Sequence, residues 1–331
     1  MRRCSGQRAR RRHSPRALRS STAAPRRPGR GRGEEFISVI VPTRDRLGPL
    51  RRCLDALSAQ TIAARLDVVV VDDGSVATES VRDLVAEYPA VRLLRRRGGG
   101  PAAARNAGAR AAKAALLCFT DDDCSPRPDW AERLVQALQE GAEAVAGVTL
   151  SAGGALADAS EIVAHAPAVA EDRGAGLAFA PSNNLACTKR LFELIEFDES
   201  YPGAAGEDRD WSARLRAAGY VLHFEPDAVI VHRQDLTFGR FLRQQIRYGQ
   251  GAHRFRRTSG EVRRLESPNF YAALVRRGFS YGFRVGLLVA AAQIATAVGF
   301  IGGWARRRFA PELSRSHGDE PRGRLARRPP T

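Results

Sequence analysis

The sequence predicts an α/β fold in which helices cover a doubly wound, mostly parallel β-sheet. Short apolar runs rich in valine and isoleucine alternate with stretches whose leucines recur at helical spacing. One run, LDVVVVDDGS at residues 66–75, is continuously apolar, as expected of a parallel strand buried on both faces. Polar clusters follow several of these runs, at the sheet edge where α/β proteins bind ligands.

The alternation is clearest in the first 120 residues, where proline and glycine mark the ends of elements. The first strand stops at Pro42, and three glycines at 98–100 precede an Ala-rich helix. The expected order is strand 36–42, helix 47–60, strand 66–75, helix 78–88, strand 91–95, helix 101–113 and strand 115–120.

The pattern weakens further along the chain, and the Ala/Gly-rich residues 151–176 receive no assignment. The expected elements there are a helix over 127–140, a strand over 142–150, a helix ending near 218, two short strands within 220–233, and a basic helix over 237–257.

The formal net charge of +17 is carried by the two ends of the chain. Residues 1–33 contain twelve arginines and no acidic residue, and residues 305–331 contain eight arginines against three acids. The segment between them is formally neutral, so we expect no specific nucleic-acid binding by the folded part. The first 33 residues have the composition of a disordered tail. An organellar transit peptide or translated upstream sequence would look the same, and no apolar core of a secretory signal is present.

Five cysteines show neither CxxC spacing nor a histidine at zinc-site intervals, which indicates buried or free thiols rather than a disulfide framework.

Three consecutive aspartates, Asp121, Asp122 and Asp123, follow the apolar run LLCF directly. Like charges this close repel one another unless a cation or backbone donors compensate them. A solvated turn before a helix would explain the pattern, since Ser125-Pro126 follows. Their place at a strand end favours a divalent-metal site.

Residues 285–304 form twenty consecutive uncharged positions, about the length that crosses a bilayer. Arginines flank both sides, which conflicts with the charge asymmetry of a spanning helix and favours an interfacial or re-entrant one. A buried C-terminal helix is the alternative.

Five motifs stand in an order and spacing that resemble family 2 glycosyltransferases of the GT-A fold. They are SVIVPTRDR, VVVVDDGS, GGGPAAARNAG, FTDDDCSP and GEDRDWSARLRAAGY. The resemblance implies a Rossmann-like sheet that binds a nucleotide sugar. It divides the chain into a disordered Arg-rich tail 1–33, a GT-A domain 34–257, a C-terminal helical region 258–305 and a disordered basic tail 306–331.

The resemblance also implies a donor site. Pro42, Thr43 and the pair Asp72-Asp73 would border the nucleoside, with Arg105 near the donor phosphates. Without the resemblance, the aspartate pair would equally fit a strand end capped by an Asp-Gly turn, and Arg105 would equally fit a structural ion pair.

In the family, the aspartate triplet is the DxD motif. Asp121 would face the ribose or the metal, Asp122 holds the variable position at the donor, and Asp123 would bind Mg²⁺ or Mn²⁺. His232, at the end of the run VIVH, would be a third metal ligand, or a structural histidine.

The same resemblance makes Asp208 the general base, supported by Glu207. Both could instead complement the dipole of a helix that begins there. Expected contacts to the acceptor or diphosphate are Asn184, Asp210, Trp211 and Arg247. Trp211 fits a buried aromatic equally well, and Arg247 lies in a sequence similar to the QxxRW motif of processive synthases.

We therefore expect an inverting, metal-dependent glycosyltransferase acting on a lipid-linked or cell-envelope glycan. It would work in the cytoplasm at the inner face of the plasma membrane, with an anionic membrane surface as partner. Two alternatives stay open: a polyprenyl-phosphate glycosyl synthase of the same fold, and an inactive GT-A binding protein whose basic tail binds nucleic acid or membrane.

Overall fold

An eight-stranded mixed sheet forms the centre of the computed structural model, which describes residues 36–169, 176–201, 203, 205–258 and 266–309. The predicted tail 1–33 lies outside the described residues, as does the predicted tail 306–331 from residue 310 on, whereas residues 306–309 belong to the last helix. The strand order is β3-β2-β1-β4-β7-β6-β8-β5. The strands are β1 Ile37–Thr43, β2 Leu66–Asp73, β3 Val91–Arg96, β4 Leu116–Phe119, β5 Cys124–Pro126, β6 Ala144–Ala152, β7 Leu185–Thr188 and β8 Leu222–Arg233.

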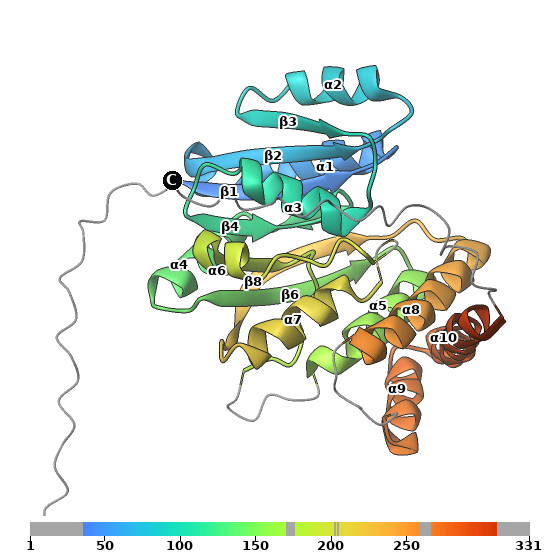
Figure 1. Ribbon diagram of the computed structural model, residues 1–331. Helices are drawn as coiled ribbons and strands as arrows, with labels where there is room; N and C mark the ends of the chain where they lie inside the picture. The colour runs from blue at the N-terminus through green and yellow to red at the C-terminus, as the bar shows by residue number, and fades with distance from the viewer. Residues whose placement is uncertain (1–35, 170–175, 202, 204, 259–265, 310–331) are drawn as a thin grey trace, which may run out of the picture. The chain divides into compact units, whose positions relative to one another are not determined.

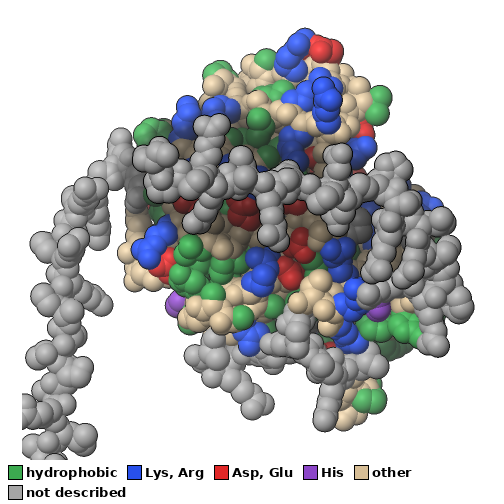
Figure 2. All heavy atoms as spheres, viewed as in Figure 1, with side chains coloured by type: hydrophobic (Ala, Val, Ile, Leu, Met, Phe, Trp, Pro, Cys, Tyr) green, Lys and Arg blue, Asp and Glu red, His purple; other side chains and the backbone are tan. Residues whose placement is uncertain are grey.

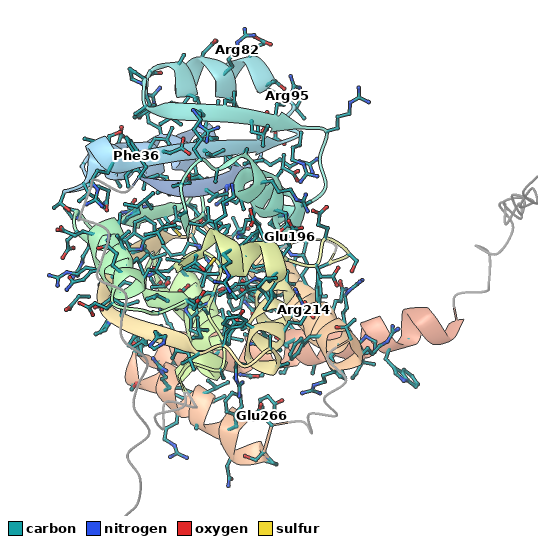
Figure 3. The ribbon with its side chains drawn as sticks, turned by 60° about the vertical axis from the view of Figure 1, so that its left-hand side comes forward. Phe36, Arg82, Arg95, Glu196, Arg214 and Glu266 are labelled. Atoms are coloured by element: carbon teal, nitrogen blue, oxygen red, sulfur yellow. The ribbon has the colours of Figure 1, made fainter. Side chains whose placement is uncertain are left out.

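Helices cover both faces of this sheet, and Figure 1 shows α3, α6 and α7 on the face toward the viewer. The helices are α1 Leu47–Ser58, α2 Thr78–Ala86, α3 Pro101–Ala111, α4 Trp130–Gln139, α5 Ala155–Val169, α6 Lys189–Leu194, α7 Glu207–Ala217, α8 Phe238–Thr258, α9 Pro268–Ser280 and α10 Phe283–Phe309. In Figure 3, Arg82 on α2 lies at one end of this unit and Glu266, just before α9, at the other.

The first half of the sheet is parallel, as predicted. Strand β1 pairs in parallel with β2 and β4, and β2 pairs in parallel with β3. Successive side chains of β1 enter different cores: Val39 and Val41 pack with α1 and α4, whereas Ile40 packs with α3 and α7. Burial on both faces explains the unbroken apolar runs. The four described cysteines are buried free thiols, as expected.

The second half of the sheet is mixed and differs from the sequence prediction in three places. Strand β7 is antiparallel to β4 and to β6. Residues 124–126 form the short strand β5 antiparallel to β8, an element that was not assigned from the sequence. The two strands expected within 220–233 are one strand, β8. Its pairing with β6 shifts register once, between Ala146 and Val148, and the strand continues past this irregularity. The unassigned residues 151–176 contain α5.

The C-terminal helices α8, α9 and α10 pack on α5 around a third apolar core that includes Ile162, Phe241 and Val289. Helices α8 and α10 touch backbone to backbone through glycines. A Cβ on Gly249 would lie 2.0 Å from the Thr296 carbonyl oxygen, and one on Gly299 would lie 2.0 Å from the Ile246 carbonyl oxygen. Small residues are therefore required where these two helices cross.

One helix of the described residues, Phe283–Ala305, is long and apolar enough to cross a membrane, with a mean hydropathy of 2.0. Only 33% of its most apolar window is buried within the protein. One side packs on α8, α9 and α5, and the other exposes six large apolar side chains: Phe283, Leu287, Ile294, Val298, Ile301 and Trp304.

The glycine crossing makes a stability prediction with an internal control. We expect Gly299→Ala to destabilise the protein by about 1–3 kcal/mol, because the added methyl forces α8 and α10 apart. Gly302→Ala, three residues along the same helix, meets no heavy atom within 4 Å and should be neutral or slightly stabilising. Urea unfolding followed by circular dichroism measures both; equal effects would contradict the close crossing.

Candidate active site

Arg105 joins two motifs that are far apart in the sequence. The Arg105 Nη2 donates to Asp121 Oδ1 at 2.5 Å, and its Nη1 donates to Glu207 Oε1 at 3.1 Å. Arg105 and Glu207 are 2% and 3% exposed, so their charges are compensated inside the protein rather than by water. The acidic triplet and the start of α7 therefore belong to one site.

The middle aspartate of the triplet is bound by protein groups. Asp122 accepts from the Thr43 hydroxyl at 2.7 Å and from Arg46 Nη1 at 2.9 Å. The second guanidinium nitrogen of Arg46 donates to Asp123 Oδ2 at 2.6 Å. Burial raises the pKa of Asp122 to about 7, although the charge of Arg46 acts in the opposite direction.

Strand pairing brings His232 to Asp123. Strands β5 and β8 are antiparallel with Cys124 opposite His232, and the Arg233 amide donates to the Asp123 carbonyl at 2.9 Å. The His232 Nε2 consequently lies 3.3 Å from Asp123 Oδ1. Burial opposes ionisation of Asp123, but the hydrogen bonds and charges of His232 and Arg46 hold its pKa below the usual range.

A buried carboxylate on α5 holds the other side of the imidazole. Glu161 Oε2 lies 3.2 Å from His232 Nδ1, and Glu161 Oε1 lies 2.8 Å from His165 Nδ1. Burial disfavours charge on His232, but hydrogen bonds to Asp123 and Glu161 outweigh it and raise its pKa well above the ordinary value. His232 thus lies between two carboxylates, an arrangement that favours its protonated form.

Helix α7 presents two adjacent carboxylates at its first turn. Gly206, directly before it, has φ 95°, a left-handed conformation that glycine adopts without strain. Burial raises the pKa of Glu207 to about 7, and repulsion from Asp208 acts in the same direction. Burial also raises the pKa of Asp208. Both shifts bring these groups toward the range in which carboxylates exchange protons at neutral pH.

A cavity of about 180 Å³ connects these groups: Asp121, Glu161, Glu207, Asp208 and His232 all line it. Figure 2 shows acidic side chains gathered at the centre of the viewed face with basic side chains around them. Arg105 lines the same cavity. Asp208 and the histidine bonded to Asp123 therefore face one shared space.

The Asp72-Asp73 pair lies at the end of β2 and is buried. Asp72 Oδ1 accepts from the Ser75 amide at 2.9 Å, and Asp73 Oδ2 accepts from the Gly100 amide at 2.7 Å. The second oxygen of Asp72 has no hydrogen-bond partner among the described residues. Pro42 is half-buried beside them, opposite Val71 in the β1–β2 register.

Four other expected contacts do not line the cavity. Asn184 is buried: it accepts from Trp130 Nε1 and donates to the carbonyls of Val148 and Ala228. Trp211 is a fully buried core aromatic whose indole donates to the Ile195 carbonyl. Asp210 accepts from Arg214 at 2.7 Å, and Arg247 is exposed on α8. In the described part of the chain, their neighbours Asn183, Arg209 and Tyr248 line the cavity instead.

The metal-ligating atoms beside Asp123 suit a hard divalent cation. Ligand atoms of Asp123, Cys124 and His232 lie within 4.8 Å of one another. Burial raises the pKa of the Cys124 thiol well above its usual value, which disfavours a thiolate at this position. Carboxylate oxygen and imidazole nitrogen remain, and oxygen-rich sites favour Mg²⁺ or Mn²⁺.

Two residues of this site were missed from the sequence. Arg46 lies within the motif SVIVPTRDR, shortly after the end of the first strand. An arginine at that place could have been predicted to pair with the aspartates that follow a neighbouring strand. Glu161 lies in the Ala/Gly-rich segment that received no assignment. Its helical spacing to His165 signals a pair on one helix face, but nothing in the sequence places that helix beside β8.

Comparison with known proteins identifies the family. The model for "Glycosyl transferase family 2" matches residues 38–162, and that for "Glycosyl transferase family group 2" matches residues 118–306. Glycosyltransferase AglE of Haloferax volcanii is 31% identical over 229 residues, which are 65% of this chain and 72% of AglE.

A pre-mycofactocin glycosyltransferase of Mycobacterium tuberculosis is 28% identical over 250 residues, covering 72% of this chain. The match spans 51% of that relative, about half its length.

A solved structure shares the fold. The mannosyltransferase PcManGT from Pyrobaculum calidifontis, in complex with GDP-Man and Mn²⁺, superimposes with a TM-score of 0.60 at 20% identity, over 84% of this chain and 88% of that one. This likeness confirms the predicted GT-A fold. With the family models and AglE, it shows that the chain belongs to the family 2 glycosyltransferases and is a glycosyltransferase.

Proposed function

We propose that this enzyme transfers a sugar from a nucleotide-sugar donor to a hydroxyl of a lipid-linked or cell-envelope glycan acceptor, with a divalent metal and inversion at the anomeric carbon. The observation that carries the proposal is that Asp121, His232 and Asp208 line the same cavity, with Arg105 joining its two acidic motifs. The GDP-Man and Mn²⁺ bound by PcManGT support the donor class.

The nucleoside is proposed to lie at the ends of β1 and β2, against Pro42, Thr43, Asp72 and Asp73. The unpartnered Asp72 Oδ2 is an acceptor for a donor of the base, because a buried oxygen without a hydrogen bond costs about 1–3 kcal/mol. Arg105 would lie near the diphosphate, where the N-terminal end of α3 also favours negative charge.

Asp123, Asp121 and His232 would hold the metal. When bound, Mg²⁺ or Mn²⁺ would offset the negative charge of the diphosphate as it departs. Binding must release the His232 proton, because an imidazole that ligates a metal is neutral at the ligating nitrogen. Glu161 would then accept the remaining N–H from Nδ1 and fix the orientation of the ring.

Asp208 is proposed as the general base. Its carboxylate takes the proton of the acceptor hydroxyl while that oxygen forms a bond to the anomeric carbon. The bond from this carbon to the diphosphate oxygen breaks on the opposite face, and its electron pair leaves with the nucleoside diphosphate. A single displacement of this kind inverts the configuration. Glu207, held by Arg105, supports the base by position and charge.

The membrane surface is the proposed location of the acceptor. The exposed apolar side of α10 and the neighbouring Arg276, Arg277 and Arg284 together fit an anionic bilayer surface. We propose that the enzyme works in the cytoplasm, associated with the inner face of the plasma membrane.

The proposed chemistry is tested by removing the proposed base and, separately, one proposed metal ligand. Asp208→Asn should lower kcat by about 10²–10⁴-fold because the base is lost. Asp123→Ala should abolish Mn²⁺-stimulated release of nucleoside diphosphate. Asp227→Asn, an exposed aspartate on β8, is the matched control and should keep full activity. Coupled detection of nucleoside diphosphate measures all three, and full turnover in both site variants would exclude the mechanism.

Glu161 is tested through the metal rather than through turnover. We expect Glu161→Ala to weaken Mn²⁺ binding by about 10–100-fold, because His232 loses the acceptor that orients it. Glu161→Gln keeps an oxygen at that position and should retain most of the affinity. Electron paramagnetic resonance of free Mn²⁺ gives the dissociation constants. Equal affinities in wild type and Glu161→Ala would show that this carboxylate does not position the ligand.

A further inference from the structure

A second cavity lies between β6, α5 and the end of α9, and at about 630 Å³ it is larger than the catalytic one. This volume is within the range of sites that hold small molecules. Its walls are mostly apolar, and the large apolar side chains that line it are Val148, Leu150, Ile162, Leu177, Phe179, Phe224 and Tyr281.

This apolar cavity adjoins the catalytic cavity. Glu161, His165, Phe179 and Pro181 line both spaces. A molecule with a polar head in the catalytic cavity can therefore extend an apolar part into the second one. Ten of the sixteen residues lining this second cavity are apolar or glycine, which suits a hydrocarbon better than a sugar. The polar ones are Thr149, Ser151, Asp158, Glu161, His165 and Arg277.

The donor does not account for an apolar cavity. The residues proposed for its nucleoside lie at the ends of β1 and β2, whereas this cavity is built by β6, α5 and α9. A nucleotide sugar carries a charged diphosphate and many hydroxyls, so it gains less from a long apolar wall than a hydrocarbon does. The remaining substrate is the acceptor.

We propose that this cavity binds the hydrocarbon chain of an amphipathic acceptor, so that the acceptor is lipid-linked rather than a free glycan. The inference rests on the proposed function, since it assigns the acceptor of that same site. Burial of the chain would stabilise the complex in proportion to the apolar area removed from water.

The mouth of the cavity gives the chain a route from a bilayer. Leu150, Phe224 and Tyr281 line the cavity and are 41%, 47% and 59% exposed. Phe279 and Phe283, on either side of Tyr281, are also exposed and lead to the apolar side of α10. Arg277 at the same edge is exposed, so its charge is available to an anionic lipid.

Displacement of a fluorescent apolar probe tests the proposal without knowledge of the natural acceptor. The full-length protein is loaded with N-phenyl-1-naphthylamine and titrated with n-alkyl β-D-glucosides of one to ten carbons, below their micelle concentrations. We expect affinity to rise by up to about fourfold per added methylene until the cavity is filled. Octyl phosphate in place of octyl glucoside then distinguishes an anionic head from a sugar head.

Two matched variants locate the binding. Leu150→Asp at the cavity mouth should weaken the binding of octyl glucoside by roughly tenfold or more, because this side chain would contact the alkyl chain. Leu150 is partly exposed, so we expect the fold to tolerate the substitution. Phe224→Asp is the second variant, should the first unfold. Ile294→Asp removes an exposed apolar group of α10 outside the cavity and should leave displacement unchanged.

The possible results separate this inference from the proposed function. An affinity for alkyl glucosides that does not depend on the length of the alkyl chain overturns the inference. So does an affinity that is lost in Ile294→Asp but kept in Leu150→Asp. Release of nucleoside diphosphate with Mn²⁺, measured in the same preparations without alkyl glucoside, reports on the donor site alone. Donor turnover with no chain-length dependence therefore leaves the proposed function standing.

Discussion

The buried guanidinium of Arg105 is the interaction on which the site depends. It contacts Asp121 and Glu207, which come from the end of the fourth strand and the start of a helix 86 residues later. Glu207 is buried and Asp121 is partly exposed, and a buried carboxylate without a cation costs several kcal/mol. One arginine therefore fixes the distance between the proposed metal site and the proposed base, and it accounts for acidic residues that would otherwise repel one another.

Charge compensation extends from this pair to the rest of the site. Asp123 has a basic side chain on each oxygen, Arg46 on one and His232 on the other, and Glu161 contacts the second ring nitrogen of that histidine. A divalent ion would have to compete with these side chains for the same carboxylate. Because α5 carries Glu161 and packs on the C-terminal helices, the part of the protein proposed to face the membrane also supports the proposed metal ligand.

The parallel half of the sheet and its motifs were predictable because local pattern decides them. Continuous apolar runs and helical leucine spacing identified β1 to β4 and their helices. The rest depends on long-range pairing that no local pattern encodes. Cys124 lies opposite His232 only because β5 pairs with β8, and Glu161 reaches that histidine from an Ala-rich helix. Asn184 and Trp211 carry polar groups that serve core hydrogen bonds instead of the cavity.

The central claim is that a cation held at Asp123 binds the diphosphate of the donor, and thermal unfolding tests it most directly. A ligand that binds only the folded state raises the melting temperature. We predict that nucleoside diphosphates stabilise the wild-type protein in the presence of Mn²⁺, and that this gain disappears without the metal and in Asp123→Ala. Equal stabilisation with and without Mn²⁺, unchanged in Asp123→Ala, would contradict the account.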